Sequence, residues 1–251
     1  MSVAIPATPE PTAVILAGGF GTRIRHLLDD VPKPMAPVAG RPFLEWVVRY
    51  FHAQGVRRFV LSTGYRAEVI ARHFAAQPVP GIEVVCVPET EPLGTAGGFL
   101  HAVAGSGFTS STWLVANGDS LALTTLDRFI AGAMKEPVSA AILALSVSDT
   151  ARFGTLDVTA AGRLVRFAEK RPGAGLINAG VYAFKGKTLG LFPPKRPLSF
   201  ELEVFPALLS SAGEIAVQAM EAPFLDIGTP ASLAEAGRFI QANLSYFSTT
   251  P

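Results

Sequence analysis

AVILAGGFGTR, residues 13–23, joins a short apolar run to a glycine-rich turn. The run Ala13–Leu16 is typical of a buried strand. Three glycines then allow the backbone to approach a bulky ligand closely. Thr22 and Arg23 follow them, and Lys33 comes ten residues after Arg23, adding a hydroxyl and two cations. Backbone N–H groups beside fixed positive charge suit a polyphosphate, so we expect a phosphate-binding loop after the first strand.

The glycine pattern differs from two well-known phosphate-binding patterns. No Gly-Lys-Ser/Thr follows the turn, which argues against the lysine-serine phosphate loop. The spacing of Gly18, Gly19 and Gly21 does not fit the dinucleotide-binding pattern Gly-x-Gly-x-x-Gly.

Length and charge favour a globular protein with a small-molecule ligand. The chain has 251 residues, with 21 basic and 20 acidic side chains and a net charge of +1. This balance gives no sign of a nucleic-acid or anionic-membrane partner. The longest apolar block, about 138–147, is far shorter than a membrane span of ~20 residues, and no signal-peptide pattern is present. The single cysteine, Cys86, excludes an internal disulfide and a cysteine-rich metal site. We expect a cytoplasmic protein.

Strand and helix patterns alternate through the first half of the chain. Residues 1–11 hold three prolines and are expected to be a disordered tail. The alternation predicts a parallel sheet with helices on both faces. After about residue 149, a hairpin over 154–159 and 163–169 indicates an antiparallel or mixed extension of the sheet. The expected strands are 13–16, 59–61, 82–87, 113–116, 140–147 and 177–184, and the expected helices are 42–54, 67–74, 96–103, 126–135, 201–210 and 231–244.

Two aspartates follow short apolar runs that lie far apart in the sequence. Asp119 comes after the strand 113–116, within Asn117-Gly118-Asp119, and Asp226 comes after Phe224-Leu225. Two carboxylates from distant strand ends are able to share one Mg²⁺, which needs few protein ligands. Aspartate is also common in ordinary turns, and the sequence leaves open whether the two residues meet.

Two further segments carry candidate binding residues. Glu89 precedes a loop in which Gly94 and Thr95 open a helix, and a carboxylate accepts both N–H groups of a guanine edge. Glu169 and Lys170 end a strand, where a lysine neutralises a phosphate. The alternative in both places is a solvated surface charge. His26 and His73 lie among charged residues and are expected to be solvated.

Taken in order, these motifs resemble the sugar-phosphate nucleotidyltransferase family over about residues 12–245. The resemblance implies a Rossmann-like mixed, mainly parallel α/β sheet flanked by helices, with a small antiparallel β extension. It also implies a single domain over 12–251, with a nucleotide part at about 12–148, a sugar part at about 149–230 and a terminal helix at 231–244. The motifs are Leu16–Arg23, Pro32–Met35, Glu91–Gly97, Asn117–Asp119, Glu169–Lys170, Asn178–Tyr182 and Asp226–Gly228.

The same resemblance assigns a reaction and its residues. A sugar 1-phosphate oxygen attacks the α-phosphorus of a nucleoside triphosphate, and pyrophosphate leaves. The implied catalytic residues are Arg23, Lys33, Asp119 and Lys170, with Mg²⁺ on Asp119 and Asp226. The implied nucleotide-binding residues are Leu16, Ala17, Gly18, Gly19, Gly21, Thr22, Arg23, Glu89, Gly94, Thr95 and Asn117. The implied sugar-phosphate-binding residues are Gly154, Glu169, Lys170 and Asn178.

Within the family, the sequence over residues 30–38 and 40–44 most resembles the sequences of enzymes that transfer GMP from GTP to D-glycero-α-D-manno-heptose 1-phosphate. Such enzymes make GDP-heptose for capsules and surface glycans. Two alternatives stay open, a mannose 1-phosphate guanylyltransferase and an N-acetylmuramate 1-phosphate uridylyltransferase. A catalytically silent nucleotide-sugar-binding subunit is a remoter one, because its signature cations and carboxylates would usually be lost. The oligomeric state is left open, a homodimer included.

Overall fold

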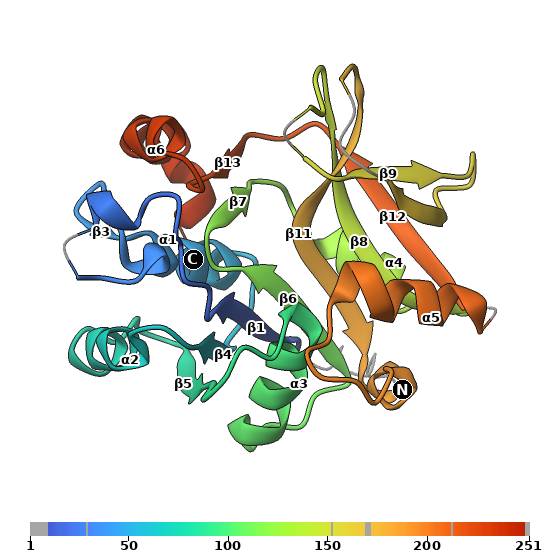
Figure 1. The fold of residues 1–251 in the computed structure, drawn as a ribbon, viewed down its shortest axis with the longest axis horizontal. Helices are drawn as coiled ribbons and strands as arrows, with labels where there is room; N and C mark the ends of the chain where they lie inside the picture. Colours follow the sequence, from blue (N-terminus) through green and yellow to red (C-terminus); the bar gives the residue numbers. More distant parts are fainter. Residues whose placement is uncertain (1–9, 29, 152, 169–171, 212, 249–251) are drawn as a thin grey trace, which may run out of the picture.

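The computed structural model describes residues 10–28, 30–151, 153–168, 172–211 and 213–248. Within these ranges the chain folds around a nine-stranded mixed sheet flanked by helices (Figure 1). The strand order is β10-β9-β11-β6-β1-β4-β5, and β8 pairs with β11 on one side and with β12 on the other. The strands are β1 (Thr12–Ala17), β4 (Arg58–Thr63), β5 (Glu83–Pro88), β6 (Thr112–Asn117), β8 (Val138–Val147), β9 (Thr155–Val158), β10 (Leu164–Ala168), β11 (Gly175–Lys185) and β12 (Glu214–Met220).

The first four of these strands form the expected parallel unit. β1 lies between β4 and β6, and β4 pairs in turn with β5, all in parallel register. The carboxyl ends of the four strands therefore lie along one edge of the sheet. Ligands gather at this edge in open parallel sheets, and the glycine-rich turn follows β1 there.

The second half extends the sheet with antiparallel pairs, as expected from the sequence. β11 runs antiparallel to both β6 and β8, so it separates two strands that point the same way. β9 and β10 form the predicted hairpin. The strand β12 and two short ladders were not predicted. The ladders pair β7 (Ser120–Ala122) with β13 (Phe224–Asp226), and β2 (Pro37–Val38) with β3 (Arg41–Pro42).

Helices cover both faces of the sheet because neighbouring strand residues point to opposite sides. In β1, Ala13 and Ile15 pack into one apolar cluster and Val14 into the other. The first cluster takes α1 (Phe43–Ala53), α2 (Ala67–Ala76), α4 (Asp127–Ala133) and α6 (Pro230–Ala242), and the second takes α3 (Thr95–Ser106) and α5 (Phe205–Ser210).

Short helical turns complete the chain and modify two predicted helices. A π-helical turn, Phe200–Val204, occupies the first half of the expected helix 201–210. The terminal helix ends at Ala242 and a 3-10 turn, Leu244–Phe247, follows it. Further 3-10 turns span Arg25–Leu27, Lys33–Met35 and Gly186–Leu191.

Two remaining expectations concern the tail and the membrane. Residues 1–9 of the predicted tail lie outside the described residues. No helix in the described ranges combines the length and the apolar character needed to cross a membrane.

Candidate active site

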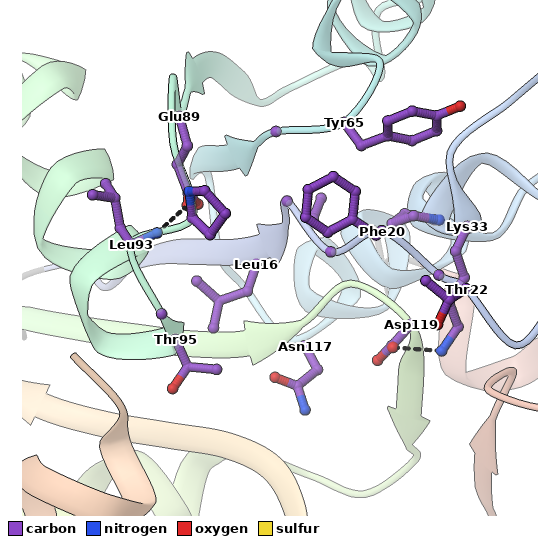
Figure 2. Close-up of a pocket in the computed structure, with 18 of the residues that line it drawn as sticks. Leu16, Phe20, Thr22, Lys33, Tyr65, Glu89, Leu93, Thr95, Asn117 and Asp119 are labelled. Atoms are coloured by element: carbon purple, nitrogen blue, oxygen red, sulfur yellow. Dashed lines mark hydrogen bonds and ion pairs between the residues drawn. The ribbon is translucent and has the colours of Figure 1, made fainter. Parts of the chain in front are cut away.

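A cavity of about 680 Å³ opens at the carboxyl edge of the parallel strands (Figure 2). Every predicted nucleotide-binding residue lines it, together with Lys33 and Asp119. The full set is Leu16, Ala17, Gly18, Gly19, Phe20, Gly21, Thr22, Arg23, Ile24, Lys33, Pro34, Gly64, Tyr65, Glu89, Thr90, Glu91, Pro92, Leu93, Gly94, Thr95, Asn117, Asp119 and Gly228.

The glycine-rich turn needs its glycines for packing within the protein. Gly21 has a φ of +58°, and a Cβ there would lie only 2.7 Å from Cβ of Lys33. A Cβ on Gly64 would lie 2.7 Å from the carbonyl oxygen of Gly18. The turn therefore lies directly against the Lys33 side chain and the end of β4, which fixes its backbone at the cavity wall.

Lys33 contacts Asp119 at one end of the cavity. Its Nζ lies 2.6 Å from Oδ2 of Asp119, and the two side chains are 9% and 35% exposed (Figure 2). Lys33 starts a 3-10 turn between Pro32 and Pro34. Because proline fixes its own φ, the flanking prolines restrict the direction in which the lysine leaves the backbone. A nearly buried lysine side chain is thus held at the cavity beside an aspartate side chain that is more exposed to solvent.

The pairing of β7 with β13 brings Asp226 beside Asp119. Asp226 lies opposite Ser120 in this ladder, and the Ile227 N–H donates to the carbonyl of Asp119 at 3.0 Å. The question that the sequence left open is thereby answered at the level of the backbone. More than a hundred residues separate the two aspartates in the chain, and two three-residue strands join them.

Charged groups of both signs surround Gly228. A Cβ on Gly228 would lie 2.5 Å from Oδ1 of Asp226 and 3.3 Å from both Nη2 of Arg23 and Nζ of Lys33. The Gly228 N–H itself donates to Asp226. Two cations and a carboxylate therefore converge where only a glycine fits.

The two aspartates offer an oxygen-only donor set to a hard cation. Within the described ranges, no group of three or more histidine, cysteine, aspartate or glutamate side chains is arranged to hold a metal. Mg²⁺ is commonly held by one or two carboxylates together with substrate phosphates. The residues present therefore fit Mg²⁺ bound jointly with a phosphorylated ligand.

Glu89 lies at the opposite end of the cavity, where it orders the loop before α3. The Ser62 hydroxyl donates to Oε1 at 2.8 Å. The Leu93 N–H donates to Oε2 at 3.3 Å (Figure 2). A Cβ on Gly98 would lie 2.6 Å from Oε1. Because a carboxylate has about four acceptor positions, two accepted bonds leave capacity for a ligand donor.

Gly154 and Asn178, the two predicted sugar-side residues that the structure describes, lie outside the cavity lining. Gly154 is exposed and precedes β9, whose Thr155 pairs with Ile177, the neighbour of Asn178. Gly154 and Asn178 therefore both lie where β9 pairs with β11. Gly180 connects this place to the cavity, because it packs directly on Asn117. Glu169 and Lys170 lie outside the described residues.

An aromatic and cationic rim borders the glycine-rich turn and was not predicted. The Phe20 ring lies 6.1 Å from that of Tyr65, whose hydroxyl accepts a hydrogen bond from Arg25 at 2.8 Å. Gly64 and Tyr65 directly follow β4, so the strand-end rule could have identified them. The lining residues Ile24, Gly64 and Tyr65 belong to none of the motifs.

Comparison with known proteins adds a family and several relatives. The family model "Nucleotidyl transferase" matches residues 12–243. Mannose-1-phosphate guanylyltransferase of Mycobacterium tuberculosis is 35% identical over 227 residues, which is 89% of this chain but only 63% of that protein. D-glycero-alpha-D-manno-heptose 1-phosphate guanylyltransferase of Campylobacter jejuni is 35% identical over 191 residues, 75% of this chain and 82% of that protein.

Two solved structures are similar to this chain in fold and in sequence. The crystal structure of HddC from Yersinia pseudotuberculosis has a TM-score of 0.80 and 32% identity, and covers 90% of this chain and 98% of that one. The same protein complexed with GMP-PN has a TM-score of 0.78 and 34% identity with the same coverage.

Proposed function

Since this chain belongs to the nucleotidyl transferase family, we propose that it transfers GMP from GTP to a sugar 1-phosphate. The proposed sugar is D-glycero-α-D-manno-heptose 1-phosphate, and the products are GDP-heptose and pyrophosphate. The observation that carries the proposal is the cavity in which the glycine-rich turn, Arg23 and Lys33 lie with Asp119, beside which the β7–β13 ladder places Asp226. The names of the Campylobacter relative and the GMP-PN complex of HddC support the choice of heptose and guanine.

The chemistry requires charge neutralisation more than a protein base. A phosphate oxygen of the sugar 1-phosphate attacks the α-phosphorus of GTP, and the bond from that phosphorus to the β-phosphate oxygen breaks. The nucleophile is already an anion, so its main obstacle is repulsion by the triphosphate. Arg23 and Lys33 reduce this repulsion. Lys33 also stabilises the negative charge that develops on the reacting α-phosphate. The N–H groups of the glycine-rich turn hold the triphosphate in line.

Asp119 and Asp226 are proposed to hold Mg²⁺. When bound, the ion would neutralise phosphate charge and orient the two substrates. Lys33 is hydrogen-bonded to Asp119 at 2.6 Å, so this ammonium lies where it can pass from the carboxylate to a phosphate. Lys170, Glu169, Asn178 and Gly154 are proposed to bind the sugar 1-phosphate. Because GTP is a cytoplasmic metabolite, we place the reaction in the cytoplasm.

Pyrophosphate release tests the proposal. Four nucleoside triphosphates are crossed with heptose, mannose and N-acetylmuramate 1-phosphates, with Mg²⁺ present. We expect the highest kcat/KM with GTP and the heptose substrate. Turnover confined to UTP and N-acetylmuramate 1-phosphate would replace the proposed substrates, and GTP binding without pyrophosphate release would indicate a silent subunit.

Mannose 1-phosphate is the second candidate sugar. The Mycobacterium relative, whose name specifies mannose, aligns with 89% of this chain. One extra carbon in a sugar is a small discriminator, worth about 10–200-fold in kcat/KM. The ratio of kcat/KM for the two sugars in the same panel decides between them.

A further inference from the structure

A chain of hydrogen bonds connects the first residue of α3 with the bulge in β11. Thr95 lines the cavity and its hydroxyl donates to Oε2 of Glu201 at 3.4 Å, as does the Ser199 hydroxyl at 2.8 Å. The Tyr182 hydroxyl donates to Oε1 of Glu201 at 2.8 Å. Nδ2 of Asn178 in turn donates to the Tyr182 oxygen at 2.7 Å. These hydrogen bonds therefore connect the proposed nucleotide side of the site with the proposed sugar side.

Tyr182 sets the direction of these bonds. Its side chain is buried among aromatic rings, with the Phe200 centroid at 5.0 Å and the Phe205 centroid at 5.3 Å. Burial, and then the nearby charge of Glu201, raises the pKa of Tyr182 well above its ordinary value, so the phenol keeps its proton. A carboxylate only accepts, so that proton goes to Glu201 and the Tyr182 oxygen is left to accept.

This polarity fixes the amide of Asn178. Nδ2 must face Tyr182, and Oδ1 then accepts from the Gly180 N–H at 3.0 Å. Gly180 is the residue of the bulge that packs on Asn117 in the cavity wall. Without the Tyr182 hydroxyl, the Gly180 N–H would remain as the partner of Oδ1, but Nδ2 would lose its acceptor.

At the other end of this series of hydrogen bonds, Leu198 bonds through its backbone to the loop before α3 and to the start of that helix. The Leu198 carbonyl accepts from the N–H groups of Ala96 and Gly97 at 2.9 and 3.1 Å, and the Leu198 N–H donates to Leu93 at 2.8 Å. Gly94 has a φ of +78°, and a Cβ there would lie 2.5 Å from the Leu198 oxygen. Residues 198–201 thus hold the loop before α3 and, through Glu201, Tyr182.

We propose that Tyr182 and Glu201 are positioning residues that keep Asn178 and the loop before α3 in one fixed arrangement. The inference rests on the proposed function in one respect, that Asn178 faces the sugar 1-phosphate and the loop faces the nucleotide. Loss of the Tyr182 hydroxyl removes one of the two described bonds that orient the Asn178 amide, the one made by Nδ2, and leaves the Glu201 bonds to Ser199 and Thr95 intact. The sugar side loosens while the nucleotide side stays ordered.

The experiment compares Tyr182→Phe with Tyr50→Phe. Tyr50 is a matched control because it is also buried and hydrogen-bonded, donating to the Thr124 carbonyl at 2.7 Å and accepting from the Thr124 N–H at 3.1 Å, away from the cavity lining. We expect both variants to lose similar thermal stability. In Tyr182→Phe, KM for the sugar 1-phosphate should rise about tenfold, with KM for GTP and kcat within about twofold of the unaltered chain.

The outcomes separate the inference from the proposed function. Each variant is assayed with the nucleotide and sugar pair that the unaltered chain turns over fastest. An unchanged sugar KM in Tyr182→Phe, or an equal rise in Tyr50→Phe, overturns the inference and leaves the proposed function standing. A rise in KM for GTP that equals the rise for the sugar also overturns it. No turnover by the unaltered chain with any pair rejects the proposed function, and the inference with it.

Discussion

Lys33 is the residue on which the proposed transfer depends most directly. Its side chain is 9% exposed and lines the cavity, and its ammonium group contacts the carboxylate that is proposed to hold Mg²⁺. Lys33→Ala removes a charge placed where negative charge develops, so kcat should fall by about 10²–10³-fold. The measurement is the initial rate of pyrophosphate release at saturating substrates. Lys187→Ala is the control, because that exposed lysine pairs with Glu136 and is no part of the cavity lining. Equal rates in the two variants would contradict the role of Lys33.

Gly21 is required by its backbone and by its neighbour together. A side chain there meets both a φ of +58° and the Lys33 Cβ at 2.7 Å. Gly21→Ala should therefore displace Lys33 or the turn, and lower kcat/KM for GTP by about tenfold or more. Gly40→Ala separates the two causes, since Gly40 has a φ of +80° and no atom within 4 Å of its Cβ position. A loss of kcat/KM in Gly40→Ala as large as that in Gly21→Ala would show that backbone strain alone is responsible.

At the same scale, the sequence motifs predicted which residues line the cavity, but they did not predict the contacts that those residues make. Glycines and cations grouped after a strand predict a phosphate loop because few other uses need both. The meeting of Asp119 and Asp226 depends on two three-residue strands, which are too short to carry a pattern. The use of Gly21 to admit the Lys33 side chain depends on a contact twelve residues away, which no local pattern records.

At the scale of elements, a buried carboxylate links α1 to α2. Glu45 has a side chain that is 2% exposed, and it accepts from Arg41, Arg49 and His73 at 2.6, 2.8 and 2.9 Å. The expectation that His73 is solvated was wrong, because its side chain is 12% exposed and bonds to Glu45. The charges near His73 in the sequence suggested the surface, whereas its partner lies one helix earlier. Burial alone would raise the pKa of Glu45, but these three donors hold it below the ordinary value of 4.5.

This lowered pKa predicts an acid-sensitive link between the two helices. A group whose pKa falls on folding stabilises the fold above its unfolded pKa, and that contribution is lost as the pH falls through the folded value. Glu45→Gln should therefore cost about 2 kcal/mol of unfolding free energy near neutral pH. The difference between the two proteins should shrink as the pH drops below 4.5. Urea unfolding of both proteins across this range is the measurement, and a difference that does not change with pH would contradict the role of Glu45.

The strand order shows where element-level prediction ends. Periodicity identified β8 and β11 individually, and the change of rhythm after residue 149 indicated a mixed extension. The insertion of β11 between β6 and β8 is a long-range pairing that strand patterns do not encode. β12 was missed although it alternates buried and half-buried residues over 214–218. Gly213 directly precedes β12, much as Gly162 precedes the hairpin strand β10, so the glycine and the alternation together could have identified it.

At the scale of the whole molecule, one sheet joins the nucleotide and sugar parts of the chain. β6 belongs to the first part and pairs with β1 on one side and with β11 of the second part on the other. Trp113 lies at this junction, opposite Thr12 and opposite Phe184. Strand residues also alternate between the two apolar clusters, so neither face of the sheet loses its packing alone. We therefore propose that the chain is one cooperative folding unit.

The two tryptophans allow this cooperativity to be measured face by face. Trp46 packs in the cluster that takes α1, and Trp113 in the cluster that takes α3. In Trp46→Phe and Trp113→Phe, the remaining tryptophan reports one face while far-ultraviolet circular dichroism reports the whole chain. We expect the two signals of each variant to share one urea midpoint, because β1 and β6 supply side chains to both clusters. GTP with Mg²⁺ at about 100 times its Kd should then raise the unfolding free energy from both signals by ~2.7 kcal/mol, since ligand bound at the strand ends stabilises the single folded state. A tryptophan transition that precedes the dichroism transition, or a GTP shift confined to one of them, would instead divide the chain into two units.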